Sequence, residues 1–249
     1  MRVVSLDTTT RSGSMALVED GRVVAEQPGD RARTHAERLP GELLALLAAH
    51  DWPLSSIDLF AVASGPGSFT GLRIGIATIQ GLAFVEGRPV APVSALEALG
   101  HVSSAGTRSG EYVGAWIDAR RQEVFSALYQ VTDAPPFDSR RLVEIEPPTV
   151  ADPAATLDRW RTITIGVPVM YIGDGVLLYR DVIERQRRPA ARIAAEAPML
   201  AAAIGCIALN LAREGRTTTA AGIQPQYVRR PDAEIDRDKR AAAVANPAE

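Results

Sequence analysis

The sequence has one cysteine, three histidines and no apolar run that matches the length of a membrane span. The lone thiol, Cys206, excludes an internal disulfide and a zinc site built from several cysteines, and it fits a reducing compartment. The most apolar stretch, residues 199–212, contains Asn210 and is short for the roughly 20 residues that a bilayer requires. We therefore expect a buried helix there. Because Asp7 comes too early for the apolar part of a signal peptide, we expect a cytoplasmic protein without membrane attachment.

An excess of charge of one sign is also missing. The 27 lysines and arginines nearly balance the 30 aspartates and glutamates, which leaves a formal net charge of −3. A general electrostatic attraction to nucleic acid is therefore not expected, although a local basic patch remains open. The 249 residues, 46% of them apolar, suffice for the core of one large domain or two modest ones.

What the sequence does contain is a repeated pattern. An apolar strand that ends in Asp7 is followed by a short polar turn and a second strand, and the same order recurs around Asp118. We interpret this as a duplicated α/β unit, with two unrelated hairpins as the alternative. The predicted parts are an N-terminal lobe over residues 1–105, completed by a helix over 198–214, a C-terminal lobe over 106–197, and a charged, poorly ordered tail over 229–249.

A glycine-rich segment, GPGSFTGLRIG at residues 65–75, follows an apolar strand and opens a helix. A Walker-type phosphate loop needs a lysine and a hydroxyl after its last glycine, whereas Leu72 and Arg73 follow Gly71 here, so that type of site is excluded. An anion at the helix N-terminus remains open. Since each glycine within a helix costs about 0.5–1 kcal/mol relative to alanine, the glycines predict a close neighbouring backbone. That neighbour is either the chain's own sheet or a helix of another subunit.

Seven short segments, in order across residues 1–230, together resemble the TsaB (YeaZ) family. They are SLDTTT at 5–10, HAERLPGELLALL at 35–47, GPGSFTGLRIG at 65–75, VSALEAL at 93–99, DARRQEVF at 118–125, GDG at 173–175 and PQYVR at 225–229. This family is the non-catalytic partner of the threonylcarbamoyl-transfer enzyme that makes t6A at position 37 of tRNAs. The resemblance implies an α/β architecture with a duplicated RNase H-like fold of the actin, Hsp70 and sugar-kinase (ASKHA) class, with a mixed sheet and flanking helices in each lobe.

The resemblance also implies partners. They are a TsaD-like catalytic subunit, a TsaE-like ATPase and a second copy of the chain in a homodimer, with tRNA reached through the complex and with ATP and metal on the partner subunits. In the family, the helices over 35–47 and 71–86 build the surface shared with the catalytic partner and with the second copy. The predicted interface residues are His35, Leu39, Leu43, Gly71, Arg73, Gly75, Thr78 and Leu82.

The first loop of the chain, DTTTRSGS at 7–14, resembles a phosphate loop, and we interpret Asp7, Thr9 and Gly13 as its vestige. The second loop carries Arg120 and Arg121, where an ATPase of this fold needs small residues, and the third adds the negative charge of Asp174. One suitable loop of three is poor support for nucleotide chemistry, so we expect no catalytic residue and no cofactor.

The metal-binding pattern is likewise incomplete. The related catalytic subunit holds its metal with two histidines four residues apart on a helix, whereas His35 of this chain is followed at that spacing by Leu39. We therefore expect no metal site in this chain.

Two enzymatic alternatives remain open at this point, an independent ATP-dependent phosphotransferase of the same fold and an M22-type peptidase. Neither Ser14 nor Ser68 lies in a G-x-S-x-G elbow, and Cys206 belongs to an apolar helix where a thiol is usually inert. The basic cluster over 184–192 fits either a solvated helix end or a contact with tRNA.

Overall fold

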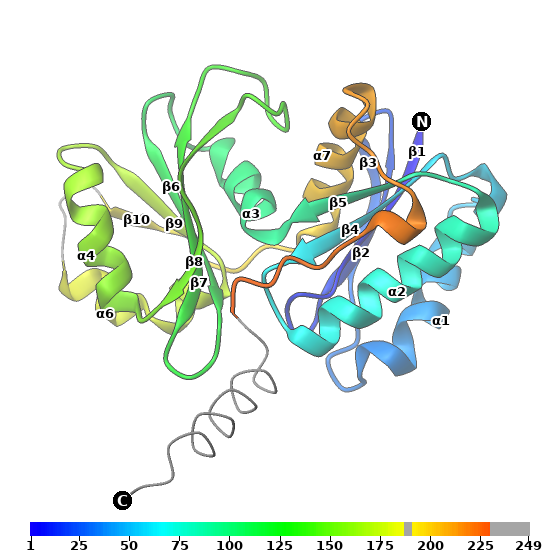
Figure 1. Ribbon diagram of the computed structural model, residues 1–249, viewed down its shortest axis with the longest axis horizontal. Coiled ribbons are helices and arrows are strands. Elements are labelled where there is room, and N and C mark those ends of the chain that lie inside the picture. Colours follow the sequence, from blue (N-terminus) through cyan, green and yellow to red (C-terminus); the bar gives the residue numbers. More distant parts are fainter. Residues whose placement is uncertain (187–190, 230–249) are drawn as a thin grey trace, which may run out of the picture.

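The computed structural model describes residues 1–186 and 191–229, which form two lobes side by side, each built on a five-stranded sheet (Figure 1). The first sheet contains β1 (Arg2–Asp7), β2 (Ser14–Glu19), β3 (Arg22–Pro28), β4 (Leu59–Gly65) and β5 (Val90–Ser94), in the order β3-β2-β1-β4-β5. The second contains β6 (Tyr112–Asp118), β7 (Val124–Val131), β8 (Leu142–Ala151), β9 (Val169–Ile172) and β10 (Ala191–Ile193), in the order β10-β9-β6-β7-β8.

The two sheets have the same topology. In each, the first strand pairs antiparallel with the second and parallel with the fourth, as β1 does with β2 and β4, and β6 with β7 and β9. The third strand extends the antiparallel side and the fifth extends the parallel side. This repetition confirms the predicted duplicated RNase H-like fold. It also places Asp7 and Asp118 at equivalent ends of equivalent strands.

The helices divide into outer and inner groups (Figure 1). Two long helices, α1 (His35–Ala49) and α2 (Phe69–Glu86), lie on the outer side of the first sheet, and α4 (Pro153–Ile163) and α6 (Arg180–Arg185) lie on the outer side of the second. Between the sheets lie α3 (Ala95–Ser104) and α7 (Ala201–Arg213). The short α5 (Asp174–Leu178) packs against β6. Two short 3-10 turns, η1 (Leu54–Ser56) and η2 (Ala220–Gly222), complete the described elements.

Local sequence signals explain where the outer helices begin. Thr34 and Glu37 form a capping box at the start of α1, and the Ser68 hydroxyl accepts a hydrogen bond from the Gly71 amide at the start of α2. The last turn of α2 ends at Gly87, whose φ of 63° is the left-handed conformation that suits glycine.

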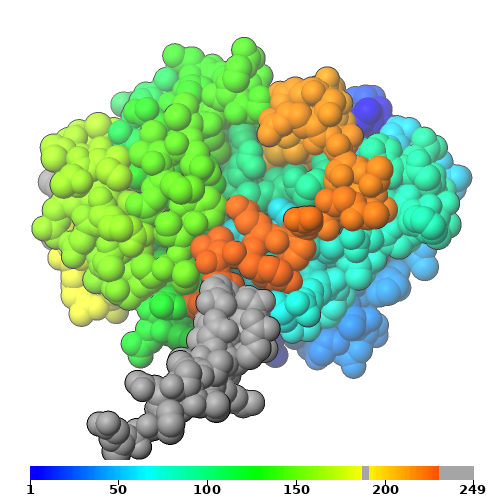
Figure 2. Space-filling view, in the orientation of Figure 1, coloured from blue at the N-terminus to red at the C-terminus, as the bar shows by residue number. Residues whose placement is uncertain are grey.

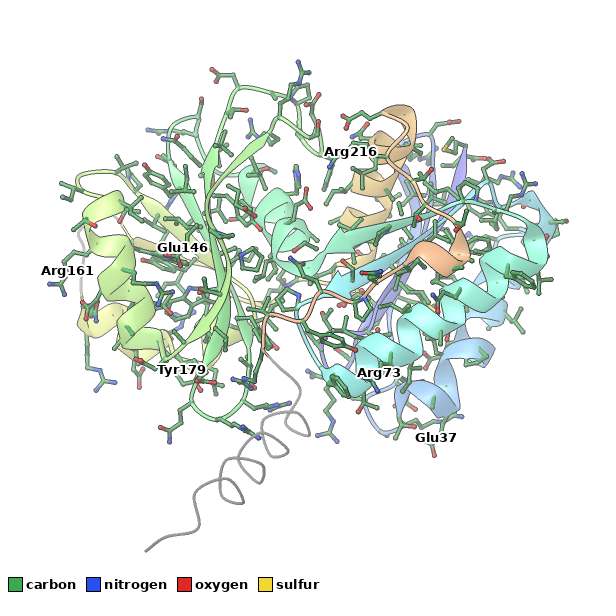
Figure 3. The ribbon with its side chains drawn as sticks, viewed as in Figure 1. Glu37, Arg73, Glu146, Arg161, Tyr179 and Arg216 are labelled. Atoms are coloured by element: carbon green, nitrogen blue, oxygen red, sulfur yellow. The ribbon has the colours of Figure 1, made fainter. Side chains whose placement is uncertain are left out.

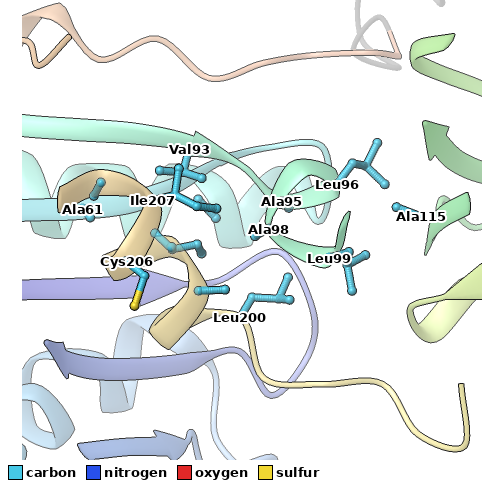
Figure 4. Packing of buried hydrophobic residues seen from close by; sticks show 14 of the residues in the cluster. Ala61, Val93, Ala95, Leu96, Ala98, Leu99, Ala115, Leu200, Cys206 and Ile207 are labelled. Carbon is cyan, nitrogen blue, oxygen red and sulfur yellow. The ribbon is translucent and has the colours of Figure 1, made fainter. Parts of the chain in front are cut away.

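One continuous apolar core joins the lobes through the inner helices (Figure 4). Ala61 and Val93 come from the first sheet, Leu96 and Leu99 from α3, and Ala115 from β6 of the second sheet. Because burying a large aliphatic side chain contributes about 1.5–3 kcal/mol, this shared core fixes how the two lobes sit. The predicted buried helix over 199–213 is α7, and Cys206 is buried in it.

The sequence indicates a strand over 168–175 and a helix over 176–187, and the structure differs from both expectations. β9 ends at Ile172, because Gly173 turns the chain with a φ of 118°. Two short helices, α5 and α6, meet at Tyr179 in place of one, and β10 is too short for the sequence to reveal. The tail lies outside the described residues from 230 onward. No helix of the described residues combines the length and the apolarity of a bilayer-spanning segment.

Candidate functional site

A cleft of about 1040 Å³ lies between the lobes. Its walls are the β1–β2 turn over residues 8–13 and the start of α2 on one side, and the β6–β7 turn over 119–123 on the other. The C-terminal segment over 226–229 forms part of the lining. All three predicted loops therefore meet here, as equivalent strand ends of a duplicated fold require.

The β1–β2 turn is folded around Asp7, whose side chain is only 3% exposed. One carboxylate oxygen, Oδ1, accepts hydrogen bonds from the Thr9 amide at 2.8 Å and the Thr9 hydroxyl at 2.6 Å. Burial raises the pKa of Asp7, and the two bonds from Thr9 oppose that rise. Gly13, with a φ of 57°, closes the turn so tightly that a Cβ there would stand 2.3 Å from the Asp7 carbonyl oxygen. Asp7, Thr9 and Gly13 thus together fix the conformation of the turn.

Side chains of α1 fasten the same turn from outside. The His35 ring donates from Nε2 to the Thr10 carbonyl at 3.0 Å and accepts at Nδ1 from Arg38 at 2.8 Å. This pairing requires the neutral imidazole, and burial lowers the pKa of His35 accordingly. Arg38, 2% exposed, also donates to the Ser12 carbonyl and to Glu42. Arg38 was not among the predicted site residues, although an arginine one turn after His35 on the apolar side of a helix is a usable signal.

The glycines of α2 also serve this turn, which corrects the expected position of the close neighbour. A Cβ on Gly71 would lie 2.1 Å from the Thr8 carbonyl oxygen, and one on Gly75 would lie 2.2 Å from the Thr8 hydroxyl. Gly67 meets Thr9 in the same way, at 2.5 Å from its Cβ. The backbone that approaches is therefore neither a strand interior nor another subunit, but the chain's own β1–β2 turn.

The predicted interface residues divide between core and surface. Leu39 and Leu43 are 1% and 2% exposed in the core of the first lobe, and Gly71 and Gly75 are buried under Thr8, so none of these four can meet a partner in this structure. The reason is that α1 and α2 direct these residues toward the first sheet and the β1–β2 turn.

The other predicted interface residues of α2 lie nearer the surface. Leu82 is half-buried against the core, and the half-buried Thr78 donates its hydroxyl to the Ile74 carbonyl at 2.8 Å. Arg73 is exposed, with its guanidinium 3.9 Å above the Phe69 ring, at the outer side of α2 (Figure 3).

The exposed outer face of α1 and α2 is nonetheless unusually apolar. On α1 it carries Pro40, Leu44 and Ala45, and on α2 it carries Ala77, Gly81, Phe84 and Val85. Leu44 is 58% exposed, Phe84 81% and Val85 76%. We call this set the outer α1–α2 face. Contiguous exposed apolar patches often mark the surfaces at which a protein binds a partner.

The β6–β7 turn does not fit a nucleotide phosphate. Arg120, Arg121 and Gln122 all have left-handed φ values, between 54° and 62°, so bulky side chains stand where small residues would be needed. The amides of Ala119, Arg120 and Glu123 already donate to oxygens of the turn itself and of Asp118. The turn therefore has little backbone left for a ligand.

The third loop, residues 173–175, is likewise packed against the protein itself. Gly173 and Gly175 pack on the backbone of β6, where a Cβ on Gly173 would lie 2.0 Å from the Trp116 carbonyl oxygen. Asp174 accepts the Asp118 amide at 3.0 Å, and burial raises the pKa of its carboxyl group. A carboxylate at this position disfavours phosphate. The residues present therefore do not fit a nucleotide bound between the lobes.

The C-terminal segment crosses from one lobe to the other, and its surface covers their junction in orange in Figure 2. The Gln226 amide donates to the Ser64 carbonyl at 2.7 Å, and the Tyr227 ring lies 5.3 Å from the Phe69 ring of the first lobe. Arg229 reaches the second lobe, where it donates to the Ala119 carbonyl and pairs with Glu123. The segment quoted from the sequence as PQYVR is thus a strap between the lobes.

The residues that a hydrolase would need are engaged elsewhere. Ser14 accepts the amides of Leu200 and Ala201, Ser68 caps α2, and within the described residues neither serine is hydrogen-bonded to a histidine. Burial raises the pKa of the Cys206 thiol to about 11. The described residues also include no cluster of three or more histidine, cysteine or acidic side chains arranged to hold a metal ion.

Comparison with known proteins points to one family. The family model for tRNA N6-adenosine threonylcarbamoyltransferase (TsaD) matches residues 21–237. The tRNA threonylcarbamoyladenosine biosynthesis protein TsaB of Bacillus subtilis is 28% identical over 74% of this chain and 76% of its own length. TsaB of Escherichia coli is 39% identical over 52% of this chain and 55% of its own length.

A solved structure shares the fold over almost its whole length. It is that of a Pseudomonas aeruginosa protein described as similar to the peptidase YeaZ, with 30% sequence identity and a TM-score of 0.76. The match covers 92% of this chain and 99% of that one. The same two-lobed architecture is thus present in a relative of similar size.

Proposed function

Since the chain belongs to the TsaB/YeaZ family, within the broader family described as tRNA N6-adenosine threonylcarbamoyltransferase, we propose that it acts in the threonylcarbamoyladenosine modification of tRNA as a non-catalytic subunit. It binds a TsaD-like transferase and supports the active arrangement of that partner. A TsaE-like ATPase and the tRNA join through the complex.

The absence of a catalytic role is supported by what the cleft residues already do. The carboxylate of Asp7 is satisfied by Thr9, and the carboxylate of Asp174 by the Asp118 amide. Of the three loops that an ATPase of this fold would use, only the β1–β2 turn has the residue pattern of a phosphate loop. The cleft thus keeps the framework of an ancestral nucleotide site, while its polar groups serve the protein itself.

The observation that carries the proposed partner role is the outer α1–α2 face. It exposes apolar side chains on the first lobe, and the small residues Ala77 and Gly81 let a partner helix approach the backbone of α2 closely. A Cβ on Gly81 would meet nothing within 4 Å. We therefore place the docking surface on the outer α1–α2 face and not at the buried Leu39 and Leu43. When the chain is alone, the same face closes a homodimer.

The test is binding to the TsaD-like transferase of the same organism by size-exclusion chromatography and titration calorimetry. Ala77→Arg places a long charged side chain on the exposed face without disturbing the core. We expect it to weaken transferase binding by about 100-fold or more, which is the size of effect expected when an interface hot spot is lost. The matched control is Ala154→Arg, on the exposed side of α4 in the second lobe, which should bind like the wild type.

Reconstitution separates the proposed role from mere binding. Threonylcarbamoyladenosine formation by transferase, ATPase and tRNA should require the wild-type chain, and Ala77→Arg should fail to restore it. Unchanged transferase binding by Ala77→Arg would reject the docking face. Transferase activity that is independent of this chain would reject the subunit role.

A further inference from the structure

Positive charge gathers in the cleft of an otherwise acidic protein. Among its described lining residues are two aspartates, Asp118 and Asp174, and six arginines. The arginines are Arg11, Arg31, Arg33, Arg120, Arg121 and Arg229. The whole chain, by contrast, has a net charge of −3. The local excess is therefore opposite in sign to the average surface, as in proteins that attract an anionic partner to one place.

The arginines come from both walls. Arg11, Arg31 and Arg33 belong to the first lobe, while Arg120 and Arg121 belong to the second, and all five are exposed. Within the described residues, Arg11 and Arg31 make no hydrogen bond or ion pair. On the opposite turn Arg120 pairs with Asp118 at 3.0 Å, but its side chain stays 80% exposed. The mouth of the cleft therefore presents Arg11 and Arg31, which have no internal partner, across from an exposed, singly paired Arg120.

The base of the cleft has the opposite character. Asp174 lines it and Asp7 lies buried near it, and each carboxylate is held by hydrogen bonds of the protein. Burial raises the pKa of both groups, and the charge of Asp174 adds to the rise at Asp7. A small phosphate ligand at the base would face these carboxylates. An anion that stays at the mouth contacts the arginines and avoids them.

Aromatic side chains stand beside the arginines. Phe69 and Tyr227 are 40% and 38% exposed, their rings lie 5.3 Å apart, and both line the cleft. Arg73 lies 3.9 Å above the Phe69 ring and donates to the Tyr227 hydroxyl at 3.1 Å, so a base stacks on the part of the pair that this arginine leaves uncovered. Proteins commonly hold unpaired nucleotides with arginine side chains that contact the phosphates and with exposed aromatic rings on which the bases stack. A paired duplex would use the arginines alone.

We propose that the mouth of this cleft is an RNA-binding surface that holds a looped, unpaired segment of RNA across the two lobes. Arg11 and Arg31 contact phosphates from one side and Arg120 from the other, while a base stacks on the Phe69–Tyr227 pair. The choice of RNA as the anionic partner rests on the proposed function in tRNA modification.

The experiment measures the binding of the full chain to an unmodified tRNA transcript and to its isolated anticodon-arm hairpin, by fluorescence anisotropy over a range of salt concentrations. We expect the triple variant Arg11→Gln, Arg31→Gln and Arg120→Gln to bind tenfold or more weakly. The slope of log affinity against log salt should also fall by about 2, because each lost phosphate contact removes about 0.7 for a single strand.

The matched control removes three arginines from outside the cleft, by Arg22→Gln, Arg161→Gln and Arg213→Gln. Arg161 belongs to α4 of the second lobe, on the opposite side of the view from Arg73 of the first lobe (Figure 3). This control should bind RNA like the wild type. An equal loss in both triple variants would overturn the proposal, as would a wild-type chain that does not bind the hairpin.

Two further measurements fix the kind of ligand and separate this proposal from the proposed function. Phe69→Ala should weaken hairpin binding without changing the salt slope, and a fully paired RNA duplex should compete poorly; equal competition by the duplex would reject the unpaired segment. The cleft triple variant should still bind the TsaD-like transferase through the outer α1–α2 face. Loss of RNA binding with intact transferase binding supports the cleft, whereas failure of the wild-type chain to bind transferase would contradict the proposed function alone.

Discussion

The two hairpin turns that face the cleft occupy equivalent places in a duplicated fold, but they are held by different means. The β1–β2 turn is fastened by buried groups, namely Arg38 and His35 of α1 and the glycines of α2. The β6–β7 turn is exposed at Arg120 and Arg121 and is held by Asp174 and by Arg229 of the C-terminal strap. The two turns thus share one topology, but the first is anchored by buried groups and the second by contacts nearer the surface.

The largest expected effect comes from removing the buried guanidinium. Arg38→Met leaves the Ser12 carbonyl and Glu42 without their donor, and breaking such a buried pair should lower the free energy of unfolding by about 4 kcal/mol. Arg120→Met at the other turn removes a side chain that is 80% exposed and should change it by less than about 0.5 kcal/mol. Urea denaturation of both variants checks the contrast, and equal losses would refute it.

A second pair of variants tests whether the α2 glycines serve the first turn. Gly71→Ala forces a Cβ against the Thr8 carbonyl oxygen, which belongs to the backbone and cannot swing away, so we expect a loss of about 2–3 kcal/mol. Gly81→Ala on the open side of the same helix should instead stabilise the fold by about 0.5–1 kcal/mol. Thermal unfolding reports both signs. A neutral Gly71→Ala would mean that the turn does not depend on this contact.

The junction between the lobes should respond to pH through His101. This residue of α3 is 1% exposed and stacks on Phe137 of the second lobe, and burial lowers its pKa to about 4. Because the unfolded chain binds the proton more tightly, stability is complete above the ordinary histidine pKa of about 6.5 and is lost as pH falls toward 4.

The loss from this one group should reach about 2 kcal/mol near pH 5. Denaturant melts of the wild type and of His101→Leu at neutral pH and near pH 5 isolate the contribution. The variant should lose less stability on acidification. Parallel losses in the two proteins would show that other groups cause the pH dependence.

The smallest effect is local to the second turn. Arg229→Ala removes the donor to the Ala119 carbonyl and the partner of Glu123, at the surface, where such contacts contribute about 1 kcal/mol or less. We expect faster amide hydrogen exchange in residues 119–123 and unchanged exchange in residues 8–13. Faster hydrogen exchange in both turns would contradict the claim that the two turns are stabilised independently.

The strand-and-aspartate repeat at Asp7 and Asp118 predicted a duplicated α/β unit but left two unrelated hairpins as an alternative, and the RNase H-like fold itself came from the family resemblance. Leu39 and Leu43 were predicted at the partner interface, but their helical spacing fits equally well the side of α1 that packs on the chain's own sheet, where both are buried. The neighbour of Gly71 and Gly75 could not be predicted, because Thr8 lies more than sixty residues away in sequence and only the folded topology brings it to α2. The strap formed by Tyr227 and Arg229 escaped prediction for the same reason.

The most direct test of the central claim, that the first lobe docks the partner while its turn is sealed by the chain itself, is hydrogen–deuterium exchange of the chain with and without the TsaD-like transferase. The account predicts new protection in peptides of α1 and α2, and no change in α4 and α6 of the second lobe. Protection confined to α4 and α6, with α1 and α2 unaffected, would contradict it.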